Sequence, residues 1–175
     1  EEGRQHSVEE FRSGDPLDRF ADLYRDGGTT AALGRPPVVL PIGRGVGGST
    51  LVNSGTCYRT PEQVRAEWEC HHGLRLAGEG YEERLDEVER MLQVAPVPAE
   101  VMGRNGAIML AGADALGWRA APLVRNAPGC GGCCQCSIGC PRNAKFGVHL
   151  NALPQAVSAG ARIVSNARVL RVVVE

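Results

Sequence analysis

Apolar residues recur at helical spacing in several separate stretches of this chain. Within residues 7–26, four of them follow the i, i+3, i+4, i+7 spacing of one helix face. They are Leu17, Phe20, Ala21 and Tyr24. Asp15 followed by Pro16 is typical of a helix start, with a capping side chain before a proline at the first helical position. The pattern predicts two short helices in residues 7–26, ended by Gly27-Gly28.

Three further helices are predicted in the middle of the chain. Residues 60–73 begin with Thr60-Pro-Glu-Gln63, which resembles a capping box. Residues 81–94 combine an apolar face with a face of Glu, Asp and Arg, the pattern of a solvent-exposed amphipathic helix. Residues 99–117 carry apolar side chains at roughly helical spacing and end at a glycine. Together these segments predict a mainly helical stretch in the middle of the chain.

The remaining segments predict extended chain and one more helix. Residues 29–40 have the composition of turn-linked extended chain. Residues 146–159 indicate a helix that Pro154 breaks or kinks. Two β-branched runs, 161–164 and 169–174, predict strands separated by a turn at Ser165-Asn166.

The most distinctive stretch is Pro41–Asn53, which contains Gly43, Gly45, Gly47 and Gly48. Such glycines let the backbone adopt positive φ and approach a ligand without an intervening Cβ. If residues 49–53 open a helix, its free N–H groups favour an anionic group such as a pyrophosphate. The spacing does not satisfy G-x-G-x-x-G, so the segment alone is also compatible with a glycine-rich surface loop.

Composition narrows the class of protein. The chain has 175 residues, of which 43% are hydrophobic and 22% charged, and this composition indicates one globular domain with its own core. A formal net charge of -1 provides no attraction to nucleic acid or to an anionic membrane. No apolar run approaches the ~20 residues of a membrane helix, and no signal peptide is recognisable. We therefore expect no nucleic-acid partner, no transmembrane segment and a cytoplasmic location.

The order of the motifs resembles that of the glucose-methanol-choline (GMC) oxidoreductases, a family of FAD-dependent alcohol oxidases and dehydrogenases. Gly43–Asn53 matches their G-R-x-x-G-G-S-[ST]-x-x-N segment, which runs beneath the isoalloxazine and the pyrophosphate. Gly139–Lys145 matches their G-C-P-x-G-A-K, with Asn143 in place of a glycine. Leu153–Ala156 and Gly160-Ala161 match their L-P-x-A and G-A elements. The resemblance spans essentially the whole chain, and we expect the chain to be an internal piece of such a protein.

The resemblance implies an α/β fold class, α+β within this chain, as part of a Rossmann-like FAD-binding domain with a helical insert. Residues 1–60 would belong to the FAD-binding domain and residues 61–125 to a helical insert framing the substrate side. Residues 126–175 would form a cysteine-rich loop and the return to the FAD-binding domain. Glu1 would hold the FAD ribose, and Ala167-Arg-Val169 would contact the adenine. The implied cofactor-binding residues are Glu1, Arg44, Gly47, Gly48, Ser49, Thr50, Asn53 and Val169.

The resemblance also implies an activity, the transfer of a hydride from an alcohol to N5 of FAD. Long-chain and sterol-like alcohols are among the candidate substrates, and the electron acceptor (oxygen, a quinone or a protein) stays open. The family's general base is a histidine near the C-terminus, outside this chain, so we assign no catalytic residue and expect the chain alone to be inactive. Val52 stands where some members attach the flavin through a histidine, so we expect FAD to bind without a covalent bond.

Five of the seven cysteines lie between residues 130 and 140. Four of them have the C-x2-C-x2-C-x3-C-P spacing of a bacterial ferredoxin run. They are Cys130, Cys133, Cys136 and Cys140. The run is single, whereas the fourth cysteine of such a run serves the other cluster in two-cluster ferredoxins, and zinc sites usually use two separated pairs. We therefore predict structural or redox-labile thiols without a metal; an iron–sulfur electron-transfer module is the alternative.

Overall fold

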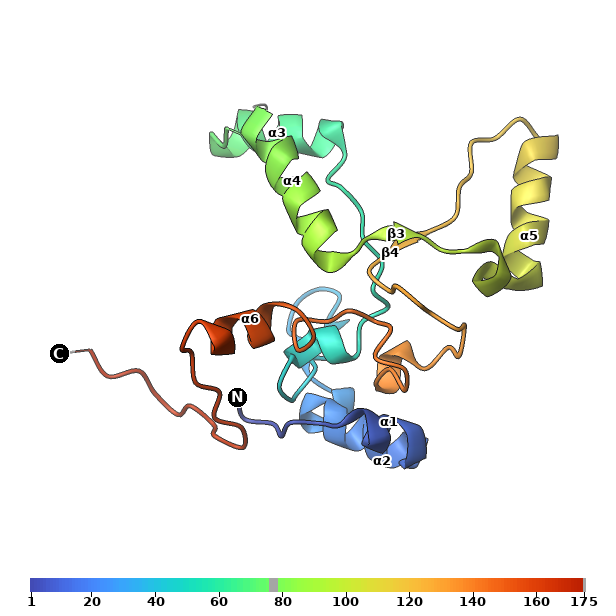
Figure 1. Ribbon diagram of the computed structural model, residues 1–175. Helices are drawn as coiled ribbons and strands as arrows, with labels where there is room; N and C mark the ends of the chain where they lie inside the picture. The colour runs from blue at the N-terminus through green and yellow to red at the C-terminus, as the bar shows by residue number, and fades with distance from the viewer. Residues whose placement is uncertain (76–78, 175) are drawn as a thin grey trace. The chain divides into compact units, whose positions relative to one another are not determined.

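The computed structural model describes residues 1–75 and 79–174, and the chain divides into two compact units. Unit 1 consists of Glu1–Gly55 with Pro128–Glu175, and unit 2 is Thr56–Ala127. Figure 1 shows this division by colour, since the blue and red ends of the chain belong to unit 1 and the green and yellow helices to unit 2.

Unit 1 is built from short elements joined by long irregular segments. Its helices and single helical turns are α1 (Val8–Ser13), α2 (Pro16–Leu23), η1 (Arg25–Gly28), η2 (Gly48–Leu51), η3 (Cys136–Ile138) and α6 (Ala152–Ser158). One antiparallel hairpin pairs β1 (Ala31–Ala32) with β2 (Val38–Val39).

Unit 2 is mainly helical. Its elements are α3 (Glu62–His72), α4 (Glu79–Leu92), β3 (Ala95–Pro96), α5 (Ala99–Ala115) and β4 (Val124–Arg125). Strands β3 and β4 pair antiparallel, so the two ends of the segment that carries α5 are joined. Across residues 1–75 and 79–174, none of the helices has both the length and the apolarity that a membrane crossing requires.

Ion pairs connect α4 to the segment before α3 and to α3 itself. The Arg59 guanidinium bonds carboxylates that lie along α4, including Glu89 at 2.6 Å and Glu82 at 2.9 Å. Arg65 of α3 pairs with Glu82, and its guanidinium carbon lies 5.5 Å from the centroid of the Tyr81 ring. Because these groups are largely exposed, the network orients the two helices and adds little stability.

The two predicted N-terminal helices are confirmed. Ser7 and Glu10 form a capping box on α1, and the Asp15 carboxylate accepts hydrogen bonds from the N–H groups of Leu17 and Asp18 on α2. The buried face of α2 differs from the predicted stripe. Leu23 is completely buried and Arg19 is 8% exposed, whereas Leu17 is 80% exposed.

The buried face of α2 carries Arg19 and Leu23 in place of Leu17. Arg19 and Leu23 are four residues apart and share one helix face. The Nη1 group of Arg19 donates to the carbonyl of Phe11 at 2.6 Å, so the guanidinium is buried with a partner. The hydrophobic pattern alone does not register a buried arginine, because the pattern counts Arg19 as polar.

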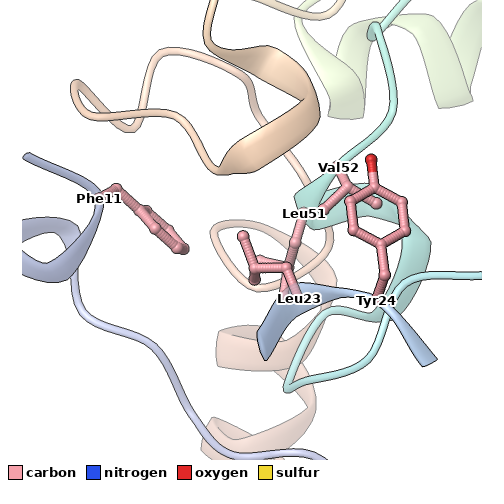
Figure 2. Packing of buried hydrophobic residues seen from close by; sticks show 5 residues of the cluster. All are labelled: Phe11, Leu23, Tyr24, Leu51 and Val52. Atoms are coloured by element: carbon pink, nitrogen blue, oxygen red, sulfur yellow. The ribbon is translucent and has the colours of Figure 1, made fainter. Parts of the chain in front are cut away.

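The core of unit 1 is small and lies where α1, α2 and η2 meet. It consists of Phe11, Leu23, Tyr24, Leu51 and Val52. Figure 2 shows Leu23 between Phe11 and the Leu51–Val52 pair. Since Leu51 and Val52 come from the glycine-rich segment, this core fixes that segment against the end of α2.

Three local predictions need correction. Residues 49–53 do not open an α-helix, because η2 is a single 3₁₀ turn. The start of α3 is not a capping box, because its N-cap is Pro61 and no side chain bonds the first turn. Helix α6 begins only at Ala152, where Asn151 caps it, so Pro154 lies in the first turn and is accommodated without a kink.

The two β-branched runs near the C-terminus are not strands in this structure. Residues 161–164 and 169–174 have no ladder partner within the described chain, although the predicted turn between them is present with Asn166 at φ 55°. A strand requires a partner to satisfy its backbone groups, and periodicity does not supply one. The mixture of helices and small sheets agrees with the expected class, while the Rossmann-like arrangement and the roles of the two units stay predictions.

The core can be tested by comparing two leucines of the same helix. We expect Leu23→Ala in the 175-residue chain to lower the free energy of unfolding by about 2–5 kcal/mol, because it empties a fully buried site. Leu17→Ala, at an exposed site, should change it by less than about 0.5 kcal/mol. Urea unfolding followed by circular dichroism measures both, and equal losses would show that the core does not lie on this face.

Candidate functional site

The glycine-rich segment folds back on itself. The Gly43 N–H donates to Ser49 Oγ at 3.0 Å, and the Gly48 N–H donates to the carbonyl of Gly45 at 2.7 Å. A Cβ added to Gly43 would lie 2.6 Å from Ser49 Cα, which no side chain tolerates. Gly43 is therefore required by the fold, because the backbone approaches itself too closely for any other residue.

The Glu1 carboxylate is bonded to the same segment. Its Oε1 accepts hydrogen bonds from the N–H groups of Gly3, at 2.7 Å, and Gly45, at 3.1 Å. Partial burial acts to raise the pKa of Glu1, but the two hydrogen bonds together with nearby positive charge, including that of Arg25, hold the pKa below its ordinary value. Glu1 is thus an ionised acceptor beside the glycines at neutral pH.

Glu1 and Val169 line the same cavity. This cavity has a volume of about 350 Å³ and also exposes Gly43, Ala167 and a group of charged side chains. The charged residues are Glu2, Arg25 and Arg168. The Ala167 N–H donates to the Glu1 carbonyl at 2.8 Å, so backbone contact keeps the two ends of the chain together here. The cavity combines a carboxylate, open backbone and an apolar edge.

The other implied residues lie on the η2 turn or beside it and do not line this cavity. Thr50 Oγ1 donates to the Gly47 carbonyl at 2.6 Å and accepts from the Val148 N–H at 3.1 Å, so this hydroxyl is used in folding. The Arg44 N–H donates to the carbonyl of Leu23 at 2.7 Å. The cofactor-binding roles of Arg44, Gly47, Gly48, Ser49, Thr50 and Asn53 stay predictions, as do those of Glu1 and Val169.

The segment Gly139–Lys145 packs against the end of the glycine-rich segment. Asn143, which replaces a glycine of the family motif, has φ 52° in the left-handed region that asparagine tolerates better than most residues. The substitution therefore preserves the backbone. Lys145 is 2% exposed, and its Nζ donates to the carbonyls of Asn53 and Cys136.

The cysteine run is an irregular loop around η3, and none of its cysteines forms a disulfide within the described part of the chain. Cys133 and Cys134 are exposed, whereas the other three cysteines are partly buried. In the part of the chain that the structure describes, no group of three or more His, Cys, Asp or Glu side chains is placed to hold a metal ion. The absence of a metal from the functional protein stays a prediction.

A second and larger cavity was not foreseen from the sequence. It has a volume of about 740 Å³ and is lined by His6, Val46, Asn143, His149 and apolar side chains of α6. Burial lowers the pKa of both histidines, and the nearby cations Arg4 and Lys145 add to this effect, so both imidazoles are neutral at pH 7. Isolated histidines far apart in the sequence carry no pattern, and only the fold brings them to one cavity.

Comparisons with known proteins identify the family. A sequence model described as GMC oxidoreductase matches residues 20–175. An uncharacterized GMC-type oxidoreductase of Mycobacterium tuberculosis is 64% identical over 173 residues, covering 98% of this chain and 28% of the relative. One of Sinorhizobium fredii is 31% identical over 89% of this chain and 31% of its own length. A long-chain-alcohol oxidase of Arabidopsis thaliana is 29% identical over 99% of this chain and 23% of its own length.

The chain belongs to the GMC oxidoreductase family, as the sequence motifs indicated. It spans less than a third of the length of these curated relatives and matches the N-terminal, FAD-binding region of the family. The described residues fit FAD, because an ionised carboxylate suits ribose hydroxyls and Gly48 leaves open space beside its backbone.

Gly48 provides a direct test of this site. It has φ +52°, and a Cβ built on it would meet no atom of the chain within 4 Å. We expect Gly48→Val in the protein expressed from its complete open reading frame to abolish FAD binding, because the new side chain occupies the space assigned to the ligand. Fluorescence titration of the apoprotein with FAD measures this.

Gly73 is the matched control, since it has φ +63° and equally open surroundings at the end of α3. Both substitutions strain the backbone by about 1–2 kcal/mol. Gly73→Val should therefore lower thermal stability as much as Gly48→Val and leave the dissociation constant of FAD unchanged. FAD binding retained in the Gly48→Val protein would place the glycines in an ordinary loop.

Proposed function

We propose that the protein carrying this chain is an FAD-dependent oxidoreductase that oxidises the CH–OH group of an alcohol. The observation that supports this proposal best is the cavity shared by Glu1, Gly43 and Val169. These residues come from three distant segments, and the family resemblance assigns two of them to the adenosine half of FAD. An iron–sulfur function would give these residues no role.

Each part of the site has a separate task in this proposal. The ionised Glu1 carboxylate accepts hydrogen bonds from the ribose hydroxyls. The backbone at Val169 contacts the adenine, and the backbone at Gly47-Gly48 lies along the pyrophosphate. Asn53, whose side chain is exposed, is assigned to the isoalloxazine. When bound, FAD supplies the group that accepts the hydride of the alcohol.

A long-chain alcohol is the substrate class that we propose. Relatives of about 30% identity carry the name long-chain-alcohol oxidase. Helix α5 and the residues after it expose large apolar side chains, among them Met109 at 74% and Trp118 at 70%. Such a surface suits an aliphatic chain better than a sugar. The family resemblance assigns the general base to a histidine outside this chain, and the electron acceptor stays open.

The proposal predicts a flavoprotein that an alcohol reduces. The protein expressed from its complete open reading frame should purify with a flavin absorption spectrum. Anaerobic addition of a long-chain primary alcohol should bleach that spectrum, and the same amount of a sugar should not. A colourless protein that FAD does not reconstitute would contradict the proposed function.

Iron analysis of the same preparation separates the second candidate. The spacing of Cys130, Cys133, Cys136 and Cys140 favours an iron–sulfur module more than any other feature of the chain does. We expect less than about one iron per ten chains, because we predict that the thiols hold no metal. Stoichiometric iron with acid-labile sulfide, lost on Cys130→Ser, would support the iron–sulfur function instead.

The mode of flavin attachment gives an independent prediction. Val52 has no nucleophile, and its side chain is 7% exposed in the core of unit 1. Precipitation with acid should therefore release all the flavin into the supernatant. Yellow colour that stays in the protein pellet would show that another residue forms a covalent bond to the flavin.

A further inference from the structure

Lys145 is the most deeply buried cation among the described residues. Its side chain is 2% exposed, and its Nζ donates to the Asn53 carbonyl at 2.8 Å and to the Cys136 carbonyl at 2.9 Å. A buried ammonium costs several kcal/mol in lost hydration unless its donors are satisfied. The contacts to backbone carbonyls offset this cost and fix both carbonyls at the same point.

The two carbonyls belong to the two motifs that the sequence singles out. Asn53 ends the glycine-rich segment, and its own N–H donates to the Ser49 carbonyl at 3.0 Å. Cys136 begins η3 in the cysteine run. The backbone N–H of Lys145 also donates to Cys140 Sγ at 3.4 Å. Lys145 is therefore the residue that joins the cysteine run to the end of the glycine-rich segment.

We propose that Lys145 is a positioning residue for the flavin, holding Asn53 in place and setting a positive charge next to it. This inference rests on the proposed function, which assigns Asn53 to the isoalloxazine. Reduction of a flavin adds negative charge to the ring system, and a cation in a poorly solvated place stabilises that charge. Lys145 thus both tightens FAD binding and raises the reduction potential of the bound flavin.

A merely structural lysine would affect stability alone, so the test needs variants that separate charge from hydrogen bonding. Lys145→Arg keeps the charge and several donors. Lys145→Gln keeps a donor and removes the charge. If the Lys145→Gln protein does not fold, Lys145→Met is used in its place, because methionine matches the buried aliphatic part of the lysine side chain.

Arg19 provides a matched control in the same unit. It is a buried cation, 8% exposed, that bonds the Phe11 and Ile138 carbonyls and the side chain of Gln135. It holds the cysteine run through Ile138, but its bonds do not reach the glycine-rich segment. Arg19→Gln therefore reports the general effect of removing a buried charge from unit 1.

The experiment uses the protein expressed from its complete open reading frame. Three quantities are measured for each variant: the FAD dissociation constant of the apoprotein, the midpoint potential of the bound flavin and the melting temperature of the apoprotein. Lys145→Gln should weaken FAD binding at least ~10-fold, the effect of losing a charged hydrogen bond, and shift the potential to a more negative value. Lys145→Arg should stay within ~3-fold of wild type in FAD binding and keep the wild-type potential. Arg19→Gln should lower only the melting temperature.

The outcomes separate this inference from the proposed function. A wild-type protein that binds no FAD would overturn both. A wild type that binds FAD, with Lys145→Gln unchanged in affinity and potential, would overturn only the role of Lys145. A shift in potential of the same size in Arg19→Gln would also overturn it, because the effect would then follow from lost stability.

Discussion

The glycine-rich segment has only one helical turn of its own, so its shape depends on hydrogen bonds from the rest of unit 1. Buried backbone groups must be paired, and here the partners come from distant parts of the chain. The N–H groups of three successive residues donate to the Leu23 carbonyl, the Glu1 carboxylate and the Arg4 carbonyl. The three donors are Arg44, Gly45 and Val46. At the other end, Lys145 binds the carbonyl of Asn53. These hydrogen bonds hold the glycine-rich segment in one conformation.

Contacts to irregular segments therefore hold unit 1 together more than contacts between its helices do. The small core of Phe11, Leu23 and Leu51 holds the glycine-rich segment against α2. The cysteine run is held to the rest of unit 1, since the Arg19 side chain bonds the Ile138 carbonyl and the Lys145 side chain bonds the Cys136 carbonyl. Cofactor-binding surfaces made of backbone need such support, because mobile glycines would lose entropy on binding.

The helical elements could be predicted because their signals are local. The Asp15-Pro16 cap and helical spacing predicted α2, and the amphipathic pattern predicted α4 within two residues at each end. Predictions failed where a distant contact decides. The burial of Leu23 in place of Leu17 depends on η2, and the runs 161–164 and 169–174 lack the partner that a strand requires. Periodicity reports which face is apolar, and it does not report what covers that face.

The sequence by itself determined the family, because ordered motifs such as Gly43–Asn53 and Gly139–Lys145 specify a backbone path that few other residues allow. Through the family resemblance it also named Glu1 and Val169 as candidate cofactor-binding residues. Only the tertiary structure decided that His6 and His149 share a cavity and that Lys145 is buried between two motifs. The physical reason is that glycine acts through its own backbone, whereas the role of a histidine or a lysine depends on which distant groups surround it.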